Sequence, residues 1–181
     1  FSYQKLYIAQ NHNYSPESQL GIINEFTNDV RLKKSANFQW SNIITRSRPI
    51  GINDKIFSNT GSQATIKLNI GHQIHLQEQS LIRIKDANTI KIDQGIASFS
   101  LVKTEKPYVI YLGEKKIKIK ALVESKITIT NNQHLSTNDS VIKLDTGSIE
   151  IAQKSNTFNL SSNEKVKLDG QRPMAKYVLT S

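Results

Sequence analysis

Histidine, cysteine and serine supply most metal ligands and nucleophiles, and none of them forms a recognisable site in this sequence. His72 and His75 are three residues apart, which in a β-strand points their side chains to opposite faces and makes them a poor metal-binding pair. The other two histidines are His12 and His134. The chain has no cysteine and no Gly-x-Ser-x-Gly elbow, so thiol chemistry is excluded and a serine hydrolase has no support. We therefore expect surface or turn histidines, no metal, no cofactor, no catalytic residue and no enzyme activity.

Most aspartates stand beside Gly, Asn, Ser or Thr, which are the residues that form tight turns. A pair of carboxylates for acid–base catalysis must lie close together in space, and no spacing in the sequence indicates such a pair. We interpret the following aspartates as turn formers: Asp54, Asp86, Asp93, Asp139, Asp145 and Asp169.

The densest basic run, Lys115 to Lys120, is a candidate site for binding an anion. In a strand, Lys116, Lys118 and Lys120 share one face and the intervening isoleucines share the other. One interpretation is an exposed strand whose lysines discourage edge-to-edge aggregation. The other is a stripe for an anionic polymer such as nucleic acid or an acidic glycan. No aromatic residues alternate with these lysines to stack on bases, which argues against nucleic acid.

Charge and the single tryptophan add two further expectations. The net charge is +9, from 24 Lys and Arg against 15 Asp and Glu, and the excess is spread along the chain. An even spread favours a generally basic surface over a nucleic-acid footprint. Trp40 is the only tryptophan, and we expect it to anchor the core, with carbohydrate stacking as the alternative.

A recurring phrase organises most of the chain. The segment Thr65-Ile66-Lys67-Leu68-Asn69-Ile70-Gly71 returns at 89–95 and at 141–147, with weaker echoes at 117–119 and 166–170. The first apolar residues stand at positions 66, 90, 117, 142 and 166. A period of about 25 residues is typical of internally repeated folds.

Each phrase alternates apolar and polar residues and ends in turn residues, which predicts short strands joined by tight turns. The fold class we expect is therefore all-β. Stacked short-strand repeats would give a β-solenoid-like or a twisted two-sheet arrangement. A sandwich with Greek-key connections is the alternative, and the regular spacing favours the stack.

Upstream of the repeats, we expect strands from Leu20 to Phe26 and from Val30 to Lys33. A helix that begins near Ser15-Pro16-Glu17 is the competing interpretation, because three apolar residues follow at intervals of three. The expected organisation is an N-terminal linker or edge segment at 1–19, an all-β domain at 20–170, and a C-terminal strand or tail at 171–181.

An ordered series of strand and turn motifs resembles the FecR-type domain family. It opens with Val30-Arg31-Leu32, Trp40, and a segment from Gly51 to Ala64 that reads Gly-Ile-Asn-Asp-Lys-Ile-Phe-Ser-Asn-Thr-Gly-Ser-Gln-Ala. Later members of the series are Ile66-Lys67-Leu68, Gly71, Gln79-Ser80-Leu81-Ile82, the segment from Ile90 to Phe99, and Pro107-Tyr108-Val109-Ile110. The resemblance covers residues 20–170 and is weaker in the second half, where the family's Gly-Thr-x-Phe motif is absent near Ala121.

The resemblance implies an all-β domain outside the inner membrane, usually behind a single membrane-spanning segment. In iron-uptake regulators such domains relay an outer-membrane signal to a sigma factor, and no catalytic residues come with the family. We therefore expect a periplasmic sensing or scaffold domain, anchored upstream of Phe1, that docks an envelope protein, with edge-strand pairing as a plausible mode. The alternative is a binding module for cell-wall glycan (peptidoglycan) or another anionic polymer.

Overall fold

The computed structural model describes residues 18–132, 139–168 and 175–178, and these form seventeen strands. They contain no helix, and so no helix that could cross a membrane. The strands are β1 (Gln19–Thr27), β2 (Val30–Lys33), β3 (Ser41–Asn42), β4 (Arg48–Gly51), β5 (Lys55–Ser58), β6 (Gln63–Leu68), β7 (Gln73–Leu76), β8 (Ser80–Asp86), β9 (Thr89–Leu101), β10 (Tyr108–Leu112), β11 (Lys115–Ala121), β12 (Ser125–Asn131), β13 (Ser140–Thr146), β14 (Ser148–Gln153), β15 (Asn156–Ser161), β16 (Glu164–Leu168) and β17 (Ala175–Val178). The all-β prediction is confirmed.

The strands form two sheets that share β9. Sheet A runs in the order β4-β1-β6-β7-β9-β12-β13-β16-β17. Sheet B runs in the order β3-β2-β5-β8-β9-β10-β11-β14-β15. The ladder between β9 and β10 is parallel, and the other ladders are antiparallel.

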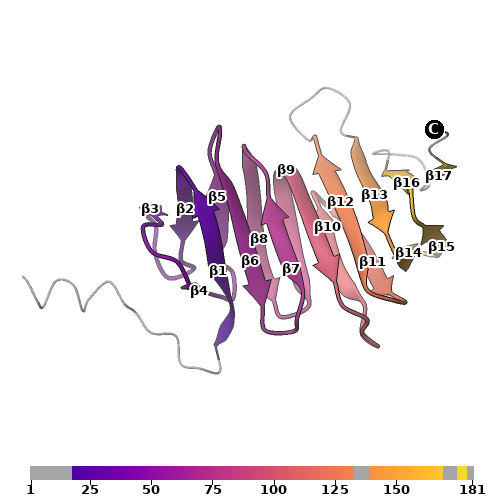
Figure 1. Ribbon diagram of the computed structural model, residues 1–181, viewed down its shortest axis with the longest axis horizontal. Helices are drawn as coiled ribbons and strands as arrows, with labels where there is room; N and C mark the ends of the chain where they lie inside the picture. The colour runs from indigo at the N-terminus through magenta and orange to yellow at the C-terminus, as the bar shows by residue number, and fades with distance from the viewer. Residues whose placement is uncertain (1–17, 133–138, 169–174, 179–181) are drawn as a thin grey trace, which may run out of the picture.

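Successive hairpins follow one another along the long axis of the molecule, as the colour gradient of Figure 1 shows. The β10–β11 hairpin lies in sheet B, β12–β13 in sheet A and β14–β15 in sheet B again. Of the arrangements left open by the sequence, this is the twisted two-sheet stack. It is not a β-solenoid, because the strands of the repeated phrase fall in both sheets and, apart from the parallel ladder between β9 and β10, pair antiparallel with their neighbours.

Alternating side chains explain how the two sheets pack. In β6, Ile66 and Leu68 are buried while Lys67 between them is exposed. The same alternation in every repeat supplies a core that consists mostly of Ile, Leu and Val. Full burial of one such side chain contributes about 1.5–3 kcal/mol, so the interface between the sheets is the main source of stability.

Strand β9 changes sheets at Gly95. Residues before the glycine pair with β8 and β10 in sheet B, and residues from Gly95 onward pair with β12 in sheet A. The hydroxyl of Ser80 receives a hydrogen bond from the backbone N–H of Ile96 at 2.9 Å and donates to the Ile96 carbonyl at 3.1 Å. The φ angle of Gly95 is +90°, a conformation that glycine adopts without steric cost. We call this pair of hydrogen bonds at Ser80 a serine clasp. A second serine clasp joins the Ser125 hydroxyl to the backbone N–H and carbonyl of Ser148, beside Gly147, which also has a positive φ angle.

The segment with the clearest family resemblance, Gly51 to Ala64, begins with a turn between β4 and β5 and continues through β5 into β6. Asn53 takes a left-handed conformation (φ 62°), which Asn tolerates better than most residues. The next residue, Asp54, is fully buried and accepts hydrogen bonds from the backbone N–H groups of Gly51 (2.9 Å) and Ser35 (3.0 Å). Asp54 is thus a turn residue, as expected, and it also ties the turn to the loop after β2.

The ends of the chain are described only in part. Strands β1 and β2 are present as predicted, and the competing helix over this region is wrong where the structure describes it. The segment 1–17 lies outside the described residues, as do 169–174 and 179–181. In the C-terminal segment, β17 pairs with β16, so a last strand is present there.

Candidate functional site

The outer faces and the ends of the two sheets carry the polar and exposed apolar side chains from which a site could be built. On β11 the predicted alternation is confirmed: Lys116 and Lys118 are exposed, Lys120 is half-buried, and the isoleucines between them face the core. The strand lies between β10 and β14, so it is not an edge strand. The interpretation that its lysines protect a sheet edge is therefore wrong.

The three lysines of β11 have different neighbours across the sheet. Lys116 lies opposite Tyr111, and Lys118 lies opposite Val109 on one side. Lys120 lies opposite Glu150 and forms an ion pair with the well-exposed Glu105, at 3.8 Å. The lysines therefore belong to three separate cross-strand rows, and any extended site has to be built across strands.

Trp40 is not the core anchor that we expected. Its side chain is 40% exposed and packs edge-on against Phe57, with 6.3 Å between ring centroids. It immediately precedes β3, a strand of two residues at the end of sheet B. Strands β8, β9 and β10 separate Phe57 on β5 from the lysines of β11, so the structure does not bring Trp40 together with them. The carbohydrate-stacking alternative stays a prediction.

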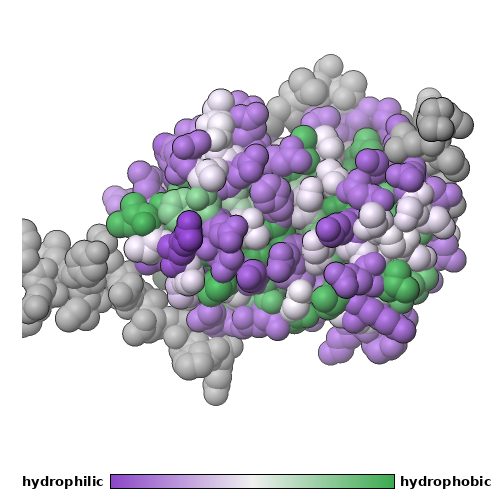
Figure 2. All heavy atoms as spheres, in the orientation of Figure 1, coloured by the Kyte–Doolittle hydropathy of each residue, from purple (hydrophilic) through white to green (hydrophobic). Residues whose placement is uncertain are grey.

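The end of the molecule around β3 is unusually apolar for a surface. Phe38 is 96% exposed and Ile44 is 78% exposed, and with Trp40 they flank β3 on both sides in sequence. Figure 2 shows hydrophobic residues at the surface of this end of the molecule. Together we call Phe38, Trp40 and Ile44 the apolar edge. Exposed large apolar side chains beside an edge strand are typical of a protein interaction surface.

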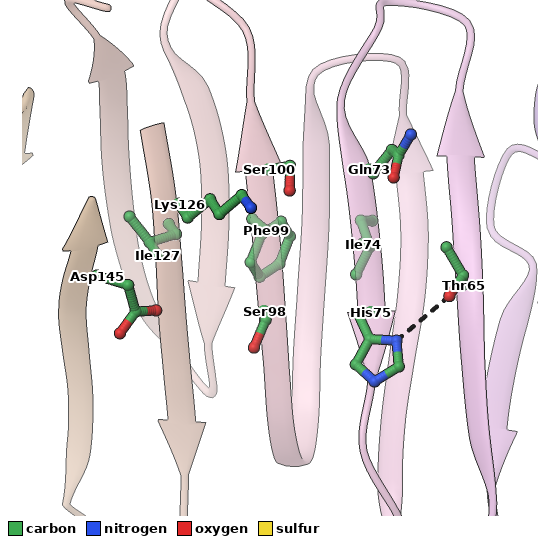
Figure 3. A pocket seen from close by; sticks show the side chains of 10 residues that line it. All are labelled: Thr65, Gln73, Ile74, His75, Ser98, Phe99, Ser100, Lys126, Ile127 and Asp145. Carbon is green, nitrogen blue, oxygen red and sulfur yellow. Dashed lines mark hydrogen bonds between the residues drawn. The ribbon is translucent and has the colours of Figure 1, made fainter. Parts of the chain in front are cut away.

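A shallow hollow of about 140 Å³ lies on sheet A, across β6, β7, β9, β12 and β13. Its floor is low because β9 presents the small side chains Ser98 and Ser100, as Figure 3 shows. The hydroxyl of Ser98 lies 3.2 Å from that of Thr128, which in turn donates to Asp145 at 2.6 Å. The sequence did not predict this hollow, because its residues come from five strands. The alternating serines of β9 are the one feature of the sequence that could have indicated it.

Hydrogen bonds hold the Thr65 and Ser98 hydroxyl groups of the hollow. The Nδ1 atom of His75 is 3.2 Å from the Thr65 hydroxyl, at the opposite side of the hollow from Asp145 (Figure 3). Ser98 is hydrogen-bonded with Thr128. Within the described ranges, no group of three His, Asp or Glu residues could hold a metal ion.

His72 lies in the turn between β6 and β7, one of the two placements that we expected for the histidines, but it is buried. Only 2% of it is exposed, because the start of β10 covers its turn: the ring of Tyr108 packs edge-on against it at 5.0 Å. The backbone N–H of Val102 donates to its Nδ1 atom at 3.2 Å, so this nitrogen carries no proton. His72 and His75 therefore occupy different environments, and His12 is outside the described residues, as is His134.

Burial lowers the pKa of His72 below its ordinary value of 6.5. As the pH falls below about 6.5, the unfolded chain binds a proton at this position that the folded protein resists, so the free energy of unfolding should decrease. The decrease should end once the pH passes the folded pKa. Urea unfolding followed by circular dichroism at several pH values between 7.5 and 5 will measure it. His72→Gln should flatten this dependence and His75→Gln should retain it; equal slopes in both variants would contradict the assignment.

Comparisons with known proteins identify the fold only. No protein-family profile matches the chain, and neither does any curated protein. Two crystal structures of a putative anti-sigma factor from Parabacteroides distasonis are similar, with TM-scores of 0.55 and 0.54 and sequence identities of 17% and 18%. In both, the match covers 68% of this chain and 59% of that chain, so this chain spans less than two thirds of the length of its structural neighbours. The described strands thus share a fold with that factor over about two thirds of the present chain.

Proposed function

We propose that this chain is a non-enzymatic sensing or scaffold domain that docks a partner protein in a signalling pathway of the bacterial envelope. Its FecR-type sequence motifs and its fold similarity to a putative anti-sigma factor both support a regulatory role. We place the domain in the periplasm, anchored to the inner membrane by a segment upstream of Phe1. These assignments follow from the resemblance.

The apolar edge is the observation that carries the docking proposal. Phe38 and Ile44 together expose most of their surface to solvent, which is unfavourable unless a partner covers them. Between them, β3 pairs with β2 through only two residues. Among the described strands, the register assigns β3 a ladder with β2 and none on its other side. A partner strand added there would satisfy its backbone groups while its own side chains cover the apolar edge.

A pull-down from envelope fractions tests this proposal. The unmodified chain should capture an envelope protein, and Phe38→Ser combined with Ile44→Ser should abolish the capture. Leu122→Ser with Val123→Ser is the matched control, because these residues are exposed by 37% and 49% on a turn after β11. Recovery of only cytosolic or nucleoid proteins, or an equal loss in both double variants, would refute the proposal.

Cell-wall glycan is the second candidate partner, favoured by the outward lysines of β11 and the net charge of +9. Sedimentation with purified peptidoglycan at rising salt separates the two proposals. Binding through charge should weaken as salt screens it, whereas docking at the apolar edge should persist.

A further inference from the structure

A row of cationic side chains crosses six neighbouring strands on the outer face of sheet B. The strands β2, β5, β8, β9, β10 and β11 succeed one another along the long axis of the molecule (Figure 1). In cross-strand register, each outward residue of the row lies directly opposite the next. The cationic row consists of Lys33, Lys55, Arg83, Lys91, Tyr111 and Lys116, in that order.

Packing alone does not explain the cationic row. Like charges directly opposite each other in a sheet are destabilising, and three successive pairs of the row, from Lys33 to Lys91, are of this kind. In the described part of the chain, Asp93 is the carboxylate that forms an ion pair with the row, at 3.5 Å from Lys91. The Nε atom of Arg83 is shielded from solvent and has no hydrogen-bond partner among the described residues. An anionic ligand on the outer face would relieve the repulsion between these cations.

The flanks of the cationic row mix apolar and charged side chains. Phe57 and Leu81 lie on one side and Val109 on the other, all of them half-buried with their side chains outward. Arg31 lies opposite Phe57, and Lys118 lies opposite Val109. The ring of Tyr111 stands within the row, with the Lys85 ammonium 5.2 Å from its centroid. A ligand laid along the row would therefore contact both cations and apolar surface.

We propose that the cationic row binds a linear polysaccharide of 1,4-linked uronic acids, laid across the strands of sheet B. Neighbouring strands are about 4.8 Å apart, so the row offers one position per strand over roughly 24 Å. A uronate chain presents one carboxylate per sugar ring, and its ring faces are apolar enough to pack on Tyr111 and Leu81. An extended acidic peptide fits less well, because its same-face side chains recur about every 6.7 Å. Single-stranded nucleic acid uses successive aromatic side chains, whereas the row contains Tyr111 alone.

Binding to polygalacturonate, measured by calorimetry with the full chain at low and moderate salt, tests the proposal. Replacing Lys55, Arg83 and Lys91 by Gln should weaken binding about 100-fold, since each cation near an anionic surface contributes about fivefold. The slope of log affinity against log salt should fall by about three. The matched control replaces Lys67, Lys126 and Lys165 by Gln on the outer face of sheet A, which changes the net charge equally. It should weaken binding less than about threefold.

Four other ligands decide between classes of partner. Fully methyl-esterified polygalacturonate should not bind, because it lacks the charge, and poly-L-glutamate should bind more weakly because it lacks the sugar rings. Tyr111→Ala should weaken polygalacturonate binding, and Tyr111→Phe, which keeps the ring, should preserve it. The proposal is overturned if polygalacturonate does not bind at low salt, or if both triple variants lose affinity equally. It is also overturned if poly-L-glutamate, a single-stranded oligonucleotide or phosphatidylglycerol vesicles bind as tightly. None of these outcomes depends on docking at the apolar edge.

Discussion

Asp54→Ala is expected to lower the free energy of unfolding by about 3–5 kcal/mol, the range for removing one partner of a buried ion pair. The carboxylate has no solvent exposure and lies 3.3 Å from the ammonium of Lys34, which is itself only 16% exposed. Burial already lowers the pKa of Lys34, opposed by the attraction of Asp54. Without the carboxylate, the Lys34 ammonium keeps its hydrogen bond to the Pro49 carbonyl, at 2.7 Å, but loses the opposite charge beside it. The N–H groups of Ser35 and Gly51 also lose their acceptor.

Chemical denaturation followed by circular dichroism measures this effect. Asp93→Ala is the control, because it removes a partly exposed ion pair with Lys91, which should contribute less than about 1 kcal/mol. Adding Lys34→Met to Asp54→Ala should recover part of the loss, since it removes the positive charge that Asp54 neutralises. If Asp54→Ala destabilised the protein no more than Asp93→Ala, the buried aspartate would not be a structural anchor.

Gly95→Ala is expected to cost about 2–5 kcal/mol of stability, because steric overlap and backbone strain add together. A Cβ atom at this position would lie 2.6 Å from the Cα atom of Ser80 and 2.8 Å from the Gln79 carbonyl oxygen. Both contacts are with backbone, so relief requires β8 to move away from the point where β9 changes sheets. The φ angle of +90° is unfavourable for alanine as well.

Gly61→Ala separates the two causes. Gly61 also has a positive φ angle, +68°, but a Cβ atom there would meet nothing within 4 Å. This variant should therefore lose only about 1–2 kcal/mol, the cost of the backbone conformation. Gly147→Ala should resemble Gly95→Ala, because its Cβ atom would lie 2.8 Å from the Cα atom of Ser125 in the second serine clasp. Equal melting temperatures for Gly61→Ala and Gly95→Ala would show that the contacts with β8 are unimportant.

Local alternation in the sequence determined the strands and their two faces. The run Lys115 to Lys120 predicts which side chains of β11 face the core, and the structure agrees, because a side-chain period of two is a property of the strand itself. The same reasoning located β1 and β2 and the all-β class. It identified the turn at Asp54, since Gly, Asn and Asp favour the backbone angles that turns require. For Asp93 and Asp145 the turn prediction is wrong, because these residues lie within β9 and β13.

Only the tertiary structure decided which strands are neighbours, and the candidate sites depend on that choice. Lys33, Lys55 and Lys91 are distant in sequence and stand in one row because hydrogen bonds between strands set the register. The same pairing exposed Trp40 at the end of sheet B and placed Tyr108 over His72. Alternation assigns a residue to one of the two faces of its strand. Which strands pair, and which side chains are covered by other segments, depends on contacts between parts of the chain that are distant in sequence. The sequence by itself therefore determined what each strand presents, and the fold decided what those side chains form together.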